Sequence, residues 1–184
     1  MAKPDRTTDL LLLAGKVISI FMQGAMVFGA IVLVAIVPLI ALLGGEGPQG
    51  YANGVHVPIK DIPTLPLLGI MLIGLGIVAC LFLFFGRLRA IIATVGEGDP
   101  FVPVNATRLS QMAWLMLGTK LLVLPAIPLG LHLAAIAEQY GEEADVSING
   151  GFDLSGILLI IILFILARVF RHGAAMREDL EGTV

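Results

Sequence analysis

The chain has 184 residues, of which 58% are hydrophobic and 14% are charged, and its mean hydropathy is +0.98. A soluble domain is about 45–50% apolar and about 25% charged, so this composition excludes an ordinary soluble domain and indicates a membrane protein. The length allows one domain. No long basic run suggests nucleic-acid binding, and a single cysteine, Cys80, excludes a disulfide framework.

Four apolar stretches predict transmembrane helices. The first covers residues 10–43, about twice the length of the apolar region of a secretory signal, so we expect a retained helix with its span at about 17–42. The other spans are predicted at 64–86, 112–136 and 154–170, and Asp153 or Ser155 is placed to cap the last helix. We therefore expect an all-α membrane protein whose four transmembrane helices form two hairpins of a four-helix bundle.

Polar segments separate these spans. They are an outer loop at 43–63 that is rich in glycine and proline, an elbow at 87–111, an acidic outer loop at 137–153 and a tail at 171–184. The first outer loop contains the turn pair Asn53-Gly54, and Val55 to Ile59 is a candidate for a short extended piece. Whether the two outer loops pair with each other as short strands stays open.

The elbow has its own predicted turn chemistry. The helix of the second span is expected to continue into the elbow and to end at Gly96 and Gly98. Asp99 and Pro100 are expected to form the turn that follows. Asn105 is then expected to cap the next helix.

The basic residues predict the orientation. Short cytoplasmic segments are enriched in Lys and Arg. Nine of the eleven Lys and Arg residues lie in the N-terminal segment, the elbow and the C-terminal side, whereas Lys60 alone lies in an outer loop. We therefore expect the elbow and both termini to be cytoplasmic, in a bacterial inner membrane.

Small residues predict how the helices pack, because close backbone approach favours helix association in lipid. They recur at a spacing of four in three spans, at Ala25 and Gly29, at Gly76 and Cys80, and at Ala126, Gly130 and Ala134. We expect a compact bundle in which the first and third spans make the closest contacts.

Lys120 is the one ionisable residue well inside a span, which makes it a functional candidate. Two interpretations stay open: an intramembrane polar contact with Gln23, or a side chain that reaches back to the cytoplasmic interface, which we favour. No carboxylate inside a span completes a proton relay. The scattered histidines and Cys80 form no catalytic, cofactor or metal set.

Phe101 is an apolar residue in a predicted cytoplasmic segment. It either folds back onto the bundle, which we favour, or offers a docking point for a partner.

The elbow and the tail together resemble a known family. The elbow residues Gly98, Pro100, Phe101, Asn105, Arg108 and Leu109 precede the third span, and the tail contains Val169, Phe170, Arg171, Gly173, Met176 and Arg177. In these positions the chain resembles the bacterial domain-of-unknown-function family 2975, small four-helix membrane proteins. Arg168 departs from the acidic residue expected there, so no carboxylate role carries over.

The resemblance implies a function only by analogy. Members are often encoded beside a small helix-turn-helix regulator. This implies a non-enzymatic regulatory or interaction protein whose cytoplasmic face binds such a transcriptional regulator. The alternative is a small transporter or channel subunit that works as a homo-oligomer, since Pro125 and Pro128 interrupt the third helix near Lys120. A membrane enzyme is the weakest interpretation, because no acid, base and nucleophile converge.

Overall fold

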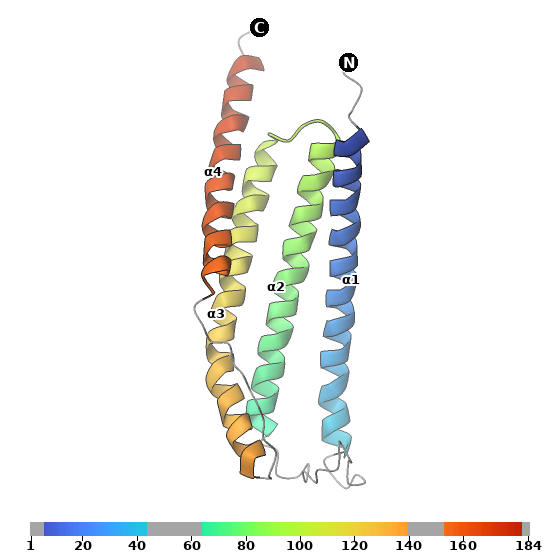
Figure 1. Cartoon of the computed structure of the whole chain (residues 1–184), viewed down its shortest axis with the longest axis vertical. Coiled ribbons are helices and arrows are strands. Elements are labelled where there is room, and N and C mark those ends of the chain that lie inside the picture. The colour runs from blue at the N-terminus through green and yellow to red at the C-terminus, as the bar shows by residue number, and fades with distance from the viewer. Residues whose placement is uncertain (1–5, 44–63, 140–152, 182–184) are drawn as a thin grey trace.

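The structure, a computed structural model, describes residues 6–43, 64–139 and 153–181. These residues form four helices and no strand: α1 (Arg6–Leu43), α2 (Thr64–Gly96), α3 (Pro103–Gln139) and α4 (Leu154–Glu181) (Figure 1). The all-α prediction is confirmed. The predicted outer loops at 43–63 and 137–153 lie almost entirely outside the described residues.

Each helix contains a segment long and apolar enough to cross a membrane, which indicates a multi-pass membrane protein. All four helices continue as regular helix past the predicted spans on the elbow side. Helix α1 already begins at Arg6, α2 runs to Gly96, α3 already begins at Pro103, and α4 runs to Glu181. The elbow is consequently a short turn of residues 97–102 between two long helices.

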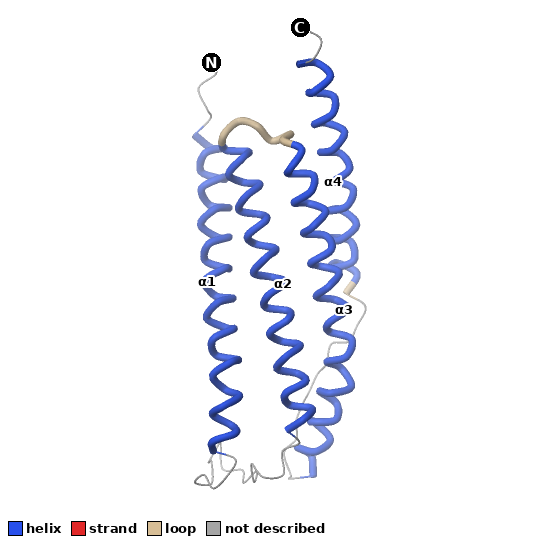
Figure 2. Tube along the Cα trace, turned by 180° about the vertical axis from the view of Figure 1, so that it is seen from behind, coloured by secondary structure: helices blue, strands red, loops and turns tan. Residues whose placement is uncertain are grey.

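The helices pack in chain order, α1 against α2, α2 against α3, and α3 against α4 (Figures 1 and 2). The start of α1, the elbow turn and the end of α4 lie at one end of the molecule, which we call the elbow end. The prediction that the first and third spans make the closest contacts is wrong, because α2 lies between them. The array is open rather than closed by an α1–α3 contact.

The α2–α3 contact explains two of the glycines. A Cβ on Gly69 would lie 3.3 Å from Leu129 Cδ1, and a Cβ on Gly76 would lie 3.2 Å from Leu122 Cδ1. Both glycines and both leucines are seven residues apart, so two leucine side chains of α3 fill two glycine notches of α2. Close approach at small residues is how membrane helices gain van der Waals contact.

The small pair of α2 therefore faces a neighbour as expected, since Cys80 contacts Gly118 of α3, with Sγ 3.9 Å from the position of a Cβ. The small pair of α1, Ala25 and Gly29, does not face a neighbouring helix. Ala25 is exposed, and a Cβ on Gly29 would meet no atom within 4 Å.

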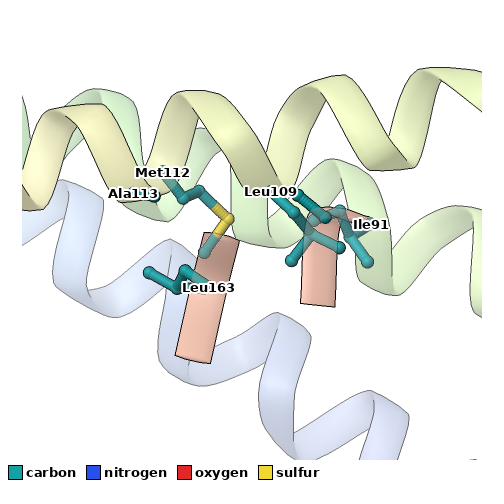
Figure 3. Close-up of a cluster of buried hydrophobic side chains, with 6 residues drawn as sticks. Ile91, Leu109, Met112, Ala113 and Leu163 are labelled. Atoms are coloured by element: carbon teal, nitrogen blue, oxygen red, sulfur yellow. The ribbon is translucent and has the colours of Figure 1, made fainter. Parts of the chain in front are cut away.

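The buried apolar core lies toward the elbow end, between α2, α3 and α4. Its members, drawn as sticks in Figure 3, are Ile91 of α2, Leu109, Met112 and Ala113 of α3, and Leu163 and Ala167 of α4. Trp114 stands beside this core with its ring 5.6 Å from that of Phe164, edge to face. Most other apolar side chains are exposed, as expected for helices that face lipid.

Candidate functional site: the elbow and the end of α4

The elbow turn begins with a glycine C-cap. Gly98 has a φ of 84°, the left-handed region that an L side chain rarely adopts. The Gly98 N–H donates to Val95 O at 3.1 Å, and the Asp99 N–H donates to Thr94 O at 3.1 Å. This pair of bonds is a Schellman motif. The prediction that Gly98 ends the second helix is confirmed.

The prediction that Asn105 caps the next helix is wrong. Helix α3 begins two residues earlier, at Pro103. Proline suits a first helical position because its ring fixes φ and because no intrahelical partner exists there for an N–H. Asn105 is therefore in the first turn, and its side chain points back into the elbow.

Asn105 is fully buried and holds the elbow together. Its Nδ2 donates to Thr94 Oγ1 at 2.7 Å and to the backbone oxygen of Pro100 at 2.9 Å. Its Oδ1 accepts from Arg108 Nη1 at 2.9 Å. One side chain thus joins the end of α2, the turn and the start of α3.

Arg108 extends this network. Its Nη1 also donates to Ala90 O at 3.1 Å, which is a backbone carbonyl of α2. A guanidinium that bonds a carbonyl and an amide oxygen at the same time fixes the spacing of two helices. Arg108 therefore links α2 to the start of α3 at the elbow.

An aromatic contact joins the elbow to α4. The Phe101 and Phe170 rings lie 5.3 Å apart. A Cβ on Gly173 would lie 2.7 Å from Phe101 Cδ1, closer than real contacts allow, so the ring occupies the space that only glycine leaves. Phe101 thus packs against α4, as the favoured interpretation predicted, although its side chain stays partly exposed.

A charged contact lies beside the aromatic one. Arg177 Nη1 donates to Asp99 Oδ1 in an ion pair between two partly exposed side chains. Together, the contacts of Phe101 and Asp99 with Phe170, Gly173 and Arg177 form what we call the clasp. It attaches the elbow turn to two successive turns of α4.

An open groove runs along α4 next to the clasp. It is mostly apolar, and residues of elbow and tail share its lining: Phe101, Arg168, Val169, Arg171, His172, Gly173, Met176, Arg177 and Leu180. The four tail residues predicted as candidate site residues thus all lie in the groove or the clasp: Phe170, Arg171, Gly173 and Arg177. Among the residues described, no group of three His, Cys, Asp or Glu could hold a metal ion.

Lys120 and Gln23 do not meet. Lys120 Nζ donates to Asp153 Oδ2, so the ammonium is held in an ion pair at the start of α4 and does not reach back to the elbow-side interface. Gln23 Nε2 instead donates weakly to Phe82 O of α2, at 3.4 Å. Both interpretations of Lys120 are wrong, because α2 separates α1 from α3 and because α4 begins beside the middle of α3 (Figure 1).

Asp153 is the partner that the sequence did not reveal. Its Oδ1 accepts from the Gly156 N–H at 3.0 Å, so the predicted cap of α4 is confirmed for this residue. The ion pair of Asp153 with Lys120 forms only because α4 starts beside the middle of α3. Hydrophobicity alone does not indicate where along α3 the helix α4 starts. Asp99 was likewise predicted only as a turn residue, and nothing in the local pattern identifies Arg177 as its partner.

Three comparisons with known proteins bear on the family of this chain. The family model described as "Protein of unknown function (DUF2975)" matches residues 17–184. The chain belongs to this family. Neither a curated protein nor a solved structure matches it. The DUF2975 match includes both stretches that the clasp brings together.

Proposed function

We propose that this DUF2975 protein is a non-enzymatic regulatory membrane protein. In this proposal its elbow end binds a soluble cytoplasmic partner, such as a helix-turn-helix transcriptional regulator. One observation carries the proposal: a mostly apolar groove at the elbow end is lined by Phe101 of the elbow and by α4 residues from Arg168 to Leu180. In this proposal the groove stands outside the hydrocarbon layer, because basic residues lie beside it.

The chemistry of the groove supports a helical partner. Val169, Gly173, Met176 and Leu180 are spaced by four, three and four residues, which places them on one face of α4. Met176 is 52% exposed and Leu180 is 72% exposed. Such a stripe is what an amphipathic helix in a groove contacts.

Basic side chains at the edge of the groove indicate the charge that the partner helix would carry. Arg168, Arg171 and His172 line the groove beside the apolar stripe. A complementary helix would carry acidic residues at its edges, because charge complementarity favours encounter and selects against basic partners. The occupant we commit to is therefore an acidic, amphipathic helix of a soluble protein.

The orientation is part of the same proposal. Lys16 near the start of α1, Arg87 and Arg89 on α2, and the Arg residues of α4 all lie toward the elbow end. Enrichment of Lys and Arg on the cytoplasmic side supports a cytoplasmic elbow and cytoplasmic termini in an inner membrane.

Site-specific photocrosslinking in cells tests this proposal. A photoreactive phenylalanine analogue replaces Met176 in the groove, and a matched control replaces Leu158, which is 57% exposed on the apolar part of α4. We expect a soluble protein to crosslink at 176 and not at 158. Crosslinks at 176 that contain only lipid or a second copy would contradict the proposal.

A binding measurement completes the test. The crosslinked protein is purified and titrated against the full chain in mild detergent. M176D places a charge in the apolar stripe and is expected to weaken binding at least about tenfold, which corresponds to about 1.4 kcal/mol. Binding that is unchanged by M176D would contradict the groove as the site.

The alternative function is a small transporter or channel subunit that works as a homo-oligomer. The Lys120–Asp153 ion pair favours it, since paired charges among apolar helices occur along transport pathways. Pro125 and Pro128 lie in the same helix, α3. Ion or solute flux through the purified protein in liposomes, abolished by the double variant K120M/D153N, which removes both charges together, would support this alternative against the regulatory one.

A further inference from the structure

The height of Lys120 in the helix array follows from its neighbours. On α3 it lies midway between Gly118 and Leu122, which contact Cys80 and Gly76 of α2. Lys120 is therefore level with the middle of the uncharged stretch of α2.

That stretch covers residues 65–86 and ends where Arg87 follows. At about 1.5 Å per residue its length is about 33 Å, close to the thickness of a hydrocarbon core of about 30 Å. The level of Lys120 is about 12 Å inside this layer from the elbow side and about 20 Å from the other side. Lys120 is consequently at hydrocarbon depth.

Asp153 must lie at nearly the same depth, because its carboxylate is bonded to the Lys120 ammonium. Figure 1 shows that α4 starts beside the middle of α3, whereas α2 and α3 continue well past this point. A helix that crossed the whole layer would start level with the far end of α2.

The contact between α3 and the start of α4 accommodates both Lys120 and Asp153. Asp153 uses both carboxylate oxygens, Oδ2 toward Lys120 and Oδ1 toward the Gly156 N–H. A Cβ on Gly156 would lie 2.5 Å from Lys120 Cε, so the glycine provides the space that the lysine stem occupies. A glycine notch, a helix cap and an ion pair thus coincide at one point.

We propose that α4 begins inside the hydrocarbon layer and that the Lys120–Asp153 pair is the anchor that holds it there. An unpaired charge at this depth is costly, and pairing removes most of that cost. Because α4 carries the groove at its other end, the anchor also sets how far the groove stands from the membrane. The anchor itself does not depend on a partner binding the groove.

Charge variants of the full chain test the anchor. K120M keeps an unbranched stem beside Gly156, and D153N keeps the cap, since asparagine caps helices as well as aspartate does. Each single variant is expected to lower the yield of folded protein in mild detergent at least about fivefold. The double variant K120M/D153N is expected to return to within about twofold of the unsubstituted chain.

Two outcomes would overturn the anchor. One is single variants with the yield of the unsubstituted chain. The other is a double variant no better than the poorer single, because removing both charges would then not have removed the cost.

Cysteine labelling tests the depth without touching the pair. In a C80A background, L154C places a thiol at the first residue of α4, where the leucine is 73% exposed, and A175C places one near the elbow end. Maleimides react with a hydrated thiolate. In membranes opened to both sides we expect a membrane-impermeant maleimide to label A175C and to leave L154C unmodified until the protein is denatured. Labelling of L154C as fast as A175C would place the start of α4 in water and contradict the proposal.

Discussion

Replacing Asn105 with alanine is the most direct perturbation of the elbow. The side chain is fully buried and makes three hydrogen bonds, to Thr94, Pro100 and Arg108. Each such bond contributes about 1 kcal/mol net, so N105A is expected to destabilise the folded protein by about 3 kcal/mol. In N105A the Pro100 carbonyl loses the side-chain donor that Asn105 provides, whereas Arg108 retains its hydrogen bond to the Ala90 carbonyl.

The single tryptophan provides the assay. The Trp114 ring lies 5.6 Å from that of Phe164, so its fluorescence reports whether α3 and α4 remain packed. Unfolding of the full chain in mixed micelles with increasing denaturing detergent gives a free energy for each variant. T107A is the matched control, since Thr107 is exposed in the same helical turn.

A third variant separates hydrogen bonding from volume. N105D keeps an acceptor for Arg108 and nearly the same shape, but a carboxylate cannot donate to the Pro100 carbonyl. N105D is therefore expected to be destabilised as well. If N105A unfolds within about 0.5 kcal/mol of T107A, the elbow network does not stabilise the protein as described.

Three further predictions concern packing and charge. G173A forces the Phe101 ring out of its notch and is expected to cost about 1–3 kcal/mol in the same assay, but much less in an F101A background. D99N breaks an ion pair of partly exposed side chains and is expected to cost less than about 1 kcal/mol, with the loss vanishing at high salt. G76L overfills the α2–α3 contact and is expected to cost about 1–3 kcal/mol, whereas G29L, where a Cβ meets open space, stays within about 0.5 kcal/mol. Equal effects at 76 and 29 would show that α2 and α3 do not pack as described.

Hydrophobicity and turn chemistry were enough to predict much of this fold. Uninterrupted apolar runs predict helices, and Gly98 predicts where α2 ends, because both signals are local. Local signals did not distinguish the competing starts of α3. Asn105 and Pro103 both suit the beginning of a helix. The helix begins at Pro103, and the Asn105 side chain instead makes hydrogen bonds across the elbow.

Contacts between helices were the part that the sequence could not supply. Small residues at a spacing of four occur on several helices, so the pattern does not say which pair approaches, and α2 was not predicted to lie between α1 and α3. The partner of Lys120 was missed for a related reason. Its identity depends on the height of α4, and a stretch that is apolar throughout gives no indication of that height.

Crosslinking across the clasp tests the central claim that the elbow and the end of α4 form one unit. In a C80A background, cysteines replace Phe101 and Gly173, whose contact defines the clasp. The control pair replaces Phe101 and Ala175, which points away around the same helix. In native membranes we predict efficient intramolecular crosslinking by a short thiol reagent for 101 with 173, and little for 101 with 175. No crosslink between 101 and 173, or equal crosslinking of both pairs, would contradict the clasp and the shared surface built on it.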